Sequence, residues 1–146
     1  MSDYHLSPMA AAILVTLDKE IPDAQATYAK GKTGKALARE ADRLNLAART
    51  VKVPAVSNML SENQDALIAQ MKADGFDPSK MRIPPEQWFT AAEGLISVRK
   101  LIDHVTANLN NFKQPNPILR DLKAVEALLV AAEQQGVRFH FSNGVL

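Results

Sequence analysis

The stretch TAAEGLISVRKLIDHVTANL, residues 90–109, decides the fold class of this chain. Its apolar residues return every three or four positions, which is the spacing of one face of an α-helix. They are Leu95, Val98, Leu101, Ile102, Val105 and Leu109. Thr90 and Glu93 form a capping box, in which the first side chain accepts a hydrogen bond from the backbone N–H three residues on. The stretch therefore predicts a long helix that buries one face.

The same kinds of signal recur along the chain and predict further helices. Ser7-Pro8 precedes an apolar run, Ser61 and Gln64 form a second capping box, and Asn116-Pro117 repeats the combination of a cap and a proline. Gly136 ends the last apolar pattern, as a glycine that stops a helix often does. The helices predicted in this way cover about residues 8–20, 24–29, 35–49, 62–74 and 117–135.

Two short segments read as extended chain. Residues 137–142 alternate apolar and polar side chains, which predicts a half-buried strand with His140 facing outward. Residues 51–60 are rich in β-branched residues and contain Pro54, so they are the expected antiparallel partner. Residues 77–85 carry three prolines and are expected to form a surface loop. The predicted fold is mainly α: one domain over residues 1–146, a compact bundle of five or six helices with one or two short strands.

Composition excludes several classes of function. The 146 residues include no cysteine, which excludes disulfides, thiol nucleophiles and iron–sulfur clusters. No run approaches the ~20 apolar residues of a membrane span, and the N-terminus lacks the basic region of a secretory signal. We therefore expect a cytoplasmic protein that needs no cofactor and does not bind a membrane. The net charge of +1 gives no overall attraction to nucleic acid.

The charge is unevenly distributed. Residues 30–52, here called the basic segment, carry seven cations against two acids, a net +5. Residues 53–98 carry three cations against six acids, a net −3. The candidate partner-binding residues are the cations Lys30, Lys32, Lys35, Arg39 and Arg43, joined by Trp88 because tryptophan is enriched at interface hot spots.

Catalytic and metal motifs are absent from the sequence. The segment around Gly31-Lys32-Thr33-Gly34-Lys35 misses the phosphate-loop pattern in both frames, because Ala26 and Ala29 stand where its first glycine belongs. A loose anion site at this loop remains an alternative to a solvated turn. His5, His104 and His140 lack the spacing of metal ligands. No catalytic residue and no metal ligand is therefore assigned.

Two segments resemble a known group of sequences. In WFTAAEGL, residues 88–95, and GVRFH, residues 136–140, the chain is similar to a group of small bacterial proteins without an assigned activity. These carry a W-F-x-x-x-E-G-L segment before a long helix and end in a G-V-R-F-H strand. The likeness extends over about residues 34–142. In size and style such proteins resemble immunity proteins, which implies binding to a toxin.

Two functions of different classes remain open on the sequence alone. The favoured one is a non-enzymatic protein-binding module of the immunity or antitoxin type, in which the basic segment meets an acidic patch on a toxin and covers its active site. The alternative is a small enzyme or small-ligand binder whose site is assembled from distant residues, with His104, His140, Trp88 and Arg138 as candidates. Nucleic-acid binding ranks third, because only 5% of the residues are aromatic and no recognition motif occurs.

Overall fold

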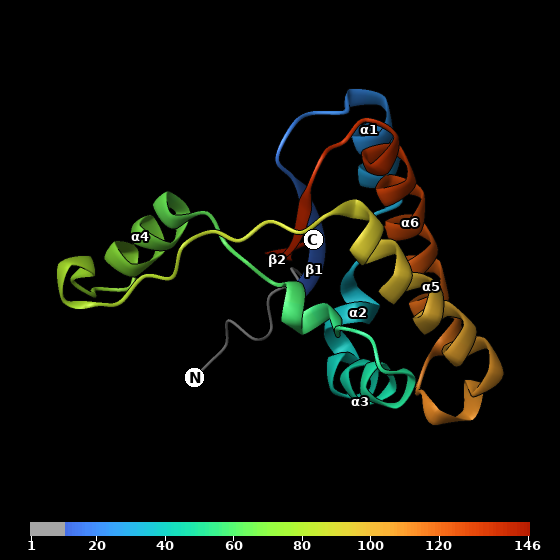
Figure 1. Ribbon diagram of the computed structural model, residues 1–146. Helices are drawn as coiled ribbons and strands as arrows, with labels where there is room; N and C mark the ends of the chain where they lie inside the picture. Colours follow the sequence, from blue (N-terminus) through green and yellow to red (C-terminus); the bar gives the residue numbers. More distant parts are fainter. Residues whose placement is uncertain (1–10) are drawn as a thin grey trace.

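The computed structural model describes residues 11–146, which form six α-helices, three 3-10 turns and one two-stranded sheet (Figure 1). The strands are β1 (Ala11–Leu17) and β2 (Phe139–Val145). The helices are α1 (Pro22–Lys30), α2 (Lys35–Arg39), α3 (Ala41–Val51), α4 (Gln64–Ala73), α5 (Ala91–Ala107) and α6 (Pro115–Gln134). The 3-10 turns are η2 (Val56–Met59), η3 (Pro78–Lys80) and η4 (Leu109–Asn111). The mainly α fold with a minor strand pair is confirmed.

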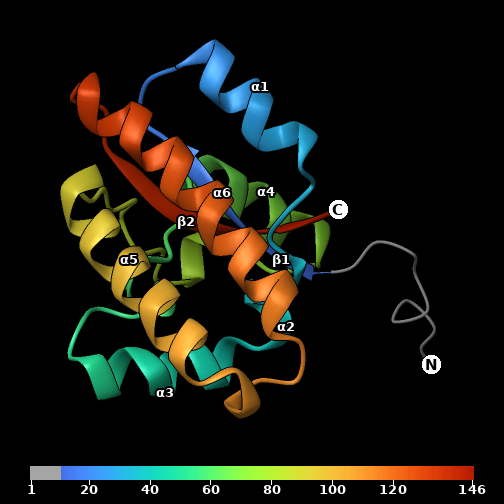
Figure 2. The same cartoon turned by 90° about the vertical axis from the view of Figure 1, so that its right-hand side faces the viewer.

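Helices α5 and α6 lie side by side over one face of the sheet and together supply ten of the 24 buried residues of the core (Figures 1 and 2). Leu95, Val98, Leu101 and Val105 of the α5 stripe are buried, and Phe139 and Phe141 of β2 belong to the same core. Thr90 caps α5 as its sequence predicts, since its hydroxyl accepts from the Glu93 N–H at 3.1 Å. Gly136 ends α6 in the left-handed conformation with φ 66°. The periodic segments therefore formed the helices that their spacing predicts.

The first predicted helix is wrong. Residues 11–17 form strand β1, whereas Ser7 and Pro8 lie outside the described residues. The apolar run, residues 9–15, is short enough for either structure, and the β-branched residues Ile13, Val15 and Thr16 favour a strand. Pairing with β2 decides the choice, because it satisfies the backbone of both segments.

The predicted strand partner is also wrong. Strand β2 pairs antiparallel with β1 in the register Thr16 to His140 and Leu17 to Phe139. Residues 51–60 instead form the end of α3 and turn η2, and their backbone pairing with the described strands is limited to one parallel bridge between Leu60 and Phe141. The outer edge of β2 is further occupied by Phe89, whose N–H and C=O both bond Phe139.

Two local predictions also need correction. The helix expected over residues 35–49 breaks at Glu40 into α2 and α3, because the Glu40 side chain turns inward to a buried site. Ser61 does not cap α4. Asn63 does, accepting from the Ala66 N–H at 3.1 Å, while the Ser61 hydroxyl accepts from the Gln87 N–H at 2.7 Å.

Residues 61–87, here called the arm, project from the body on the side of the sheet away from α5 and α6 (Figure 1). The arm contains α4, η3 and the proline-containing loop that the sequence predicts. Helix α4 has no buried residue, in contrast to α5 and α6. Within residues 11–146, no helix combines the length and the apolar character that crossing a bilayer requires.

Candidate functional site

The predicted cations follow one another from the end of α1, through the loop, into α2 and α3 (Figure 2). Lys30, Lys32, Lys35, Arg39 and Arg43 are all exposed. Of these, only Arg43 forms an ion pair with a described carboxylate, at 3.7 Å from Glu40. The structure therefore presents most of the basic segment to solvent with its charge uncompensated.

A buried carboxylate of the chain itself already accepts from the N–H groups that follow Gly34. The buried Asp121 carboxylate on α6 accepts from the backbone N–H groups of Ala36 and Leu37, at 3.0 and 3.3 Å. Gly34 itself is required, because a Cβ there would lie 2.5 Å from the Ile13 carbonyl oxygen at φ +123°. The alternative of a loose anion site at the start of α2 therefore loses its donors to Asp121.

Glu40 organises a hollow in the basic segment. Its carboxylate is 3% exposed and accepts from the N–H groups of Lys113 and Gln114, at 2.7 and 3.0 Å, just before α6. This contact brings Lys113 beside the arginines. The result, here called the basic hollow, has a volume of about 280 Å³ and is lined by Arg39, Glu40, Asp42, Arg43 and Lys113. Three cations line it against two acids, and the oxygens of one of these acids, Glu40, already accept from backbone donors.

Lys113 is the functional candidate that the sequence did not reveal. It lies in a turn, 61 residues beyond the end of the basic segment, and its neighbours in the sequence do not indicate that it belongs to the same site. No local signal in the sequence could have suggested it, because the contact that places Lys113 there joins it to Glu40, 73 positions earlier.

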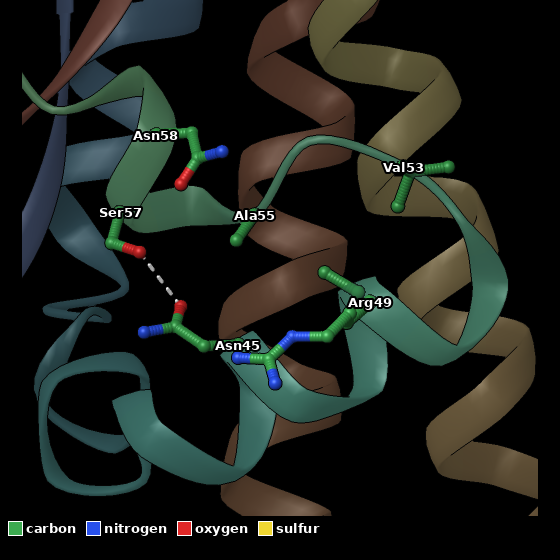
Figure 3. Close-up of a pocket in the computed structure, with 7 residues that line it drawn as sticks. Asn45, Arg49, Val53, Ala55, Ser57 and Asn58 are labelled. Carbon is green, nitrogen blue, oxygen red and sulfur yellow. Dashed lines mark hydrogen bonds between the residues drawn. The ribbon is translucent and has the colours of Figure 1, made fainter.

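A second hollow, here called the α3–η2 pocket, has a volume of about 320 Å³ (Figure 3). Arg49 and Asn45 of α3 form one wall, Ser57 and Asn58 of η2 the other, and Ala48, Val53 and Ala55 supply apolar surface. The Ser57 hydroxyl donates to the Asn45 side-chain oxygen at 2.8 Å, which leaves the Asn45 amide group available as a donor. The pocket combines apolar surface with a cationic rim.

Trp88 is not part of the basic segment's surface. It packs on His140 of β2, with ring centroids 4.5 Å apart and planes tilted by 42°. His140 was expected to face outward, but it is 1% exposed. The alternation along β2 holds. The face of the sheet that carries the even-numbered residues of β2 is not exposed to solvent at His140, because the base of the arm covers it.

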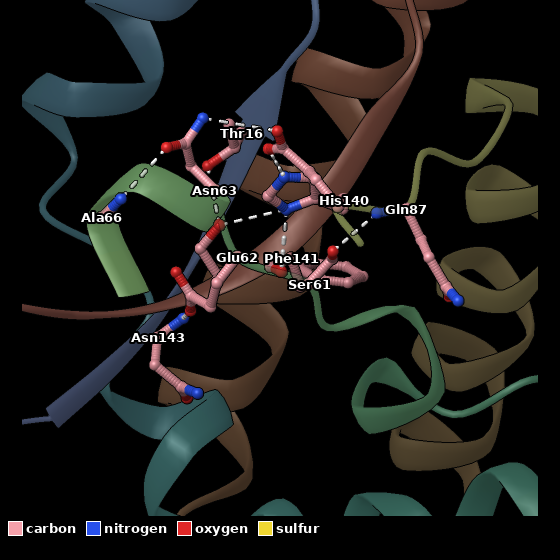
Figure 4. Close-up of polar contacts among 11 residues, drawn as sticks. Thr16, Ser61, Glu62, Asn63, Ala66, Gln87, His140, Phe141 and Asn143 are labelled. Carbon is pink, nitrogen blue, oxygen red and sulfur yellow. Dashed lines mark hydrogen bonds and ion pairs between the residues drawn. The ribbon is translucent and has the colours of Figure 1, made fainter. Parts of the chain in front are cut away.

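His140 lies at the centre of a polar chain between the arm and the sheet (Figure 4). Its Nε2 lies 2.7 Å from the Glu86 carboxylate, and its Nδ1 lies 3.1 Å from both the Ser142 hydroxyl and the Phe141 carbonyl. Ser142 is bonded in turn to Thr16 of β1 at 2.8 Å. The Glu86 carboxylate and the Phe141 carbonyl are acceptors, whereas the Ser142 hydroxyl can either donate or accept.

The other candidates of the enzyme hypothesis lie elsewhere. His104 is half-buried near the end of α5 beside Asn108, 3.5 Å from its side-chain amide. Arg138 forms an ion pair with Asp18 at 2.9 Å. Burial acts to raise the pKa of Asp18, but hydrogen bonds from the Arg138 N–H and guanidinium outweigh it and hold that pKa below its usual value. The structure thus brings Trp88 and His140 together, whereas His104 contacts Asn108 and Arg138 contacts Asp18.

No three His, Cys, Asp or Glu side chains among residues 11–146 converge in a way that could hold a metal ion. Comparison of the chain with protein-family models, with curated proteins and with solved structures finds no match.

Proposed function

We propose that this chain is a protein-binding module that docks its basic segment on an acidic surface of another protein, in the manner of an immunity protein that covers the active site of a toxin. The observation that carries the proposal is the basic hollow. A carboxylate from a partner would meet Arg39, Arg43 and Lys113 together, and arginine forks suit carboxylates in two-point contact.

The structure supports a binding role through the way the hollow is built. Glu40 fixes the turn before α6, so Lys113 and the arginines are held by a buried contact and not only by flexible side chains. A preorganised site loses less conformational entropy when a partner binds. The exposed lysines around it would add long-range attraction, which raises the association rate and falls with added salt.

The test is quantitative affinity capture from the native host with three forms of the chain. The first is unchanged, the second carries Arg39→Glu, Arg43→Glu and Lys113→Glu, and the third carries Lys100→Glu, Arg120→Glu and Lys123→Glu. The third form makes the same change of charge on exposed residues of α5 and α6. We expect one stoichiometric protein with the unchanged chain and the control, and its loss with the second form. Recovery of no stoichiometric protein, or equal recovery with all three, contradicts the proposal.

A second candidate, catalysis by Ser142, is favoured by one observation. Its hydroxyl lies 3.1 Å from a ring nitrogen of His140, whose other nitrogen bonds Glu86. In such a reaction the Ser142 proton would pass to Nδ1, yet that nitrogen also faces the Phe141 carbonyl, which requires a donor. Labelling with a fluorophosphonate tests whether Ser142 is a nucleophile. A covalent adduct that is lost in Ser142→Ala would establish the enzyme, and the absence of an adduct would exclude a serine nucleophile.

A further inference from the structure

The tip of the arm holds an exposed aromatic side chain in a fixed backbone. Gly75, at φ 86°, ends α4, with its N–H bonded to the Lys72 carbonyl and the Phe76 N–H bonded to the Met71 carbonyl. This pair of bonds is a Schellman motif, which usually tucks the residue after the glycine against the helix. Phe76 is nevertheless 56% exposed.

The end of α6 shows what the same motif does elsewhere in this molecule. Gly136 donates to Glu133, and Val137 donates to Ala132, in the same two-bond pattern. There the following residue, Val137, is 4% exposed and joins the core. Phe76 therefore occupies the position in this motif that Val137 occupies at the end of α6, but Phe76 is exposed whereas Val137 is buried in the core.

The flanks of Phe76 are acidic. Asp74 precedes it by two residues and Asp77 follows it, and both are exposed. The α3–η2 pocket has the opposite charge, with the exposed cation Arg49 in its wall beside Val53 and Ala55 (Figure 3). The exposed cation Lys52 directly precedes the lining residue Val53 in the chain. Neither Arg49 nor Lys52 pairs with any carboxylate of residues 11–146.

We propose that the arm tip of one copy of this chain fills the α3–η2 pocket of a second copy. Phe76 would cover the apolar surface of the pocket, and Asp74 and Asp77 would meet Arg49 and Lys52 at its rim. The two surfaces carry opposite charge, which favours their encounter over contacts of each with itself. A reciprocal pair contains two such contacts. The basic hollow takes no part, so this inference does not rest on the proposed function.

The experiment is sedimentation velocity on charge-swapped chains. Variant A carries Asp74→Lys and Asp77→Lys, and variant B carries Arg49→Glu and Lys52→Glu. The unchanged chain is expected to dimerise at micromolar concentrations, and each variant alone is expected to sediment as a monomer. A mixture of A and B is expected to dimerise again. In the mixed pair, the lysines of arm A face the glutamates of pocket B, and the second contact keeps its original charges.

Asp77 also accepts from the Ser79 N–H at 3.0 Å, so variant A is accompanied by one that leaves this turn intact. Phe76→Ala is expected to weaken dimerisation by at least about tenfold, because interface aromatics carry much of the binding energy. Ile96→Ala, which shortens a 57% exposed apolar residue on α5, serves as the matched control and is expected to dimerise normally. The proposal is overturned if the unchanged chain is monomeric, if A or B alone dimerises as well as the unchanged chain, or if their mixture stays monomeric.

Discussion

Glu40 and Asp121 are carboxylates that accept hydrogen bonds at the start of each other's helix: Asp121 of α6 does so at α2, and Glu40 at the end of α2 does so at α6. Asp121, on α6, accepts from the first-turn N–H groups of α2. Glu40, which ends α2, accepts from the two N–H groups just before α6. Both carboxylates are at most 3% exposed. Each lies where a helix start presents unpaired donors and partial positive charge.

Removing the Asp121 carboxylate should destabilise the fold strongly. Asp121→Ala leaves the Ala36 and Leu37 N–H groups without their acceptor, and we expect a loss of about 3 kcal/mol in the free energy of unfolding. Asp121→Asn keeps one acceptor oxygen and should lose about half as much. Urea denaturation measures both. Glu133→Ala, an exposed acid on the same helix, is the control and should change little, whereas equal loss in control and variant would contradict this role.

Gly94 should not tolerate a methyl group. A Cβ at this position would lie 2.4 Å from the Phe139 ring and 2.9 Å from Leu129. The clash should outweigh the roughly 1 kcal/mol by which alanine favours a helix over glycine, and we expect Gly94→Ala to lower stability by about 1–3 kcal/mol.

Ser97, one turn along α5, provides the contrast to Gly94. Its hydroxyl is buried and finds no partner among the described residues. Ser97→Ala should therefore raise the thermal midpoint, because it removes an unsatisfied polar group and favours the helix. Differential scanning calorimetry of both variants tests the pair. A Gly94→Ala chain as stable as the unchanged one would show that Phe139 can move aside.

Tyr28 should lose its proton at a higher pH than a free tyrosine does. Burial raises the pKa of Tyr28 to about 12, while its hydroxyl oxygen accepts from the Val15 N–H at 3.1 Å. The folded state thus holds this proton more tightly than the unfolded chain does, where the pKa is about 10. The resulting stability, at most about 3 kcal/mol, is complete below about pH 10 and disappears as the pH rises towards 12.

The titration of Tyr28 can be measured without a contribution from the other tyrosine. The chain has two tyrosines, so Tyr4→Phe leaves Tyr28 as the only phenol. Its absorbance at alkaline pH should change near 12 in the folded protein. A transition at the pH of free tyrosine, with the fold intact by circular dichroism, would show that Tyr28 is solvated.

The bond between Glu86 and His140 should fasten the arm. Glu86→Ala leaves a buried ring nitrogen without its acceptor and frees the base of the arm, where Asn63 also reaches Glu86 at 3.5 Å. We expect amide hydrogen exchange over residues 61–87 to quicken by about tenfold, while amides of α5 change little. Asp103→Ala, which removes an exposed acid further along α5, is the control. Unchanged exchange in the arm would mean that other contacts hold it.

The sequence by itself determined the helices that bury a long periodic face. The spacing from Leu95 to Val105, the Thr90 cap and the Gly136 stop are local signals, and local backbone physics acts on them regardless of what lies across the core. The cations of the basic segment were also visible, because exposed charge requires no partner.

Tertiary structure decided whatever depended on a distant partner. Residues 11–17 became a strand because β2, more than 120 positions later, completed their hydrogen bonds. The helix expected over residues 35–49 broke because Glu40 found the start of α6, and that contact added Lys113 to the basic hollow. His140 was buried by the base of the arm, not by its own strand. Local propensity cannot encode these outcomes, because their free energy arises only when separated segments meet.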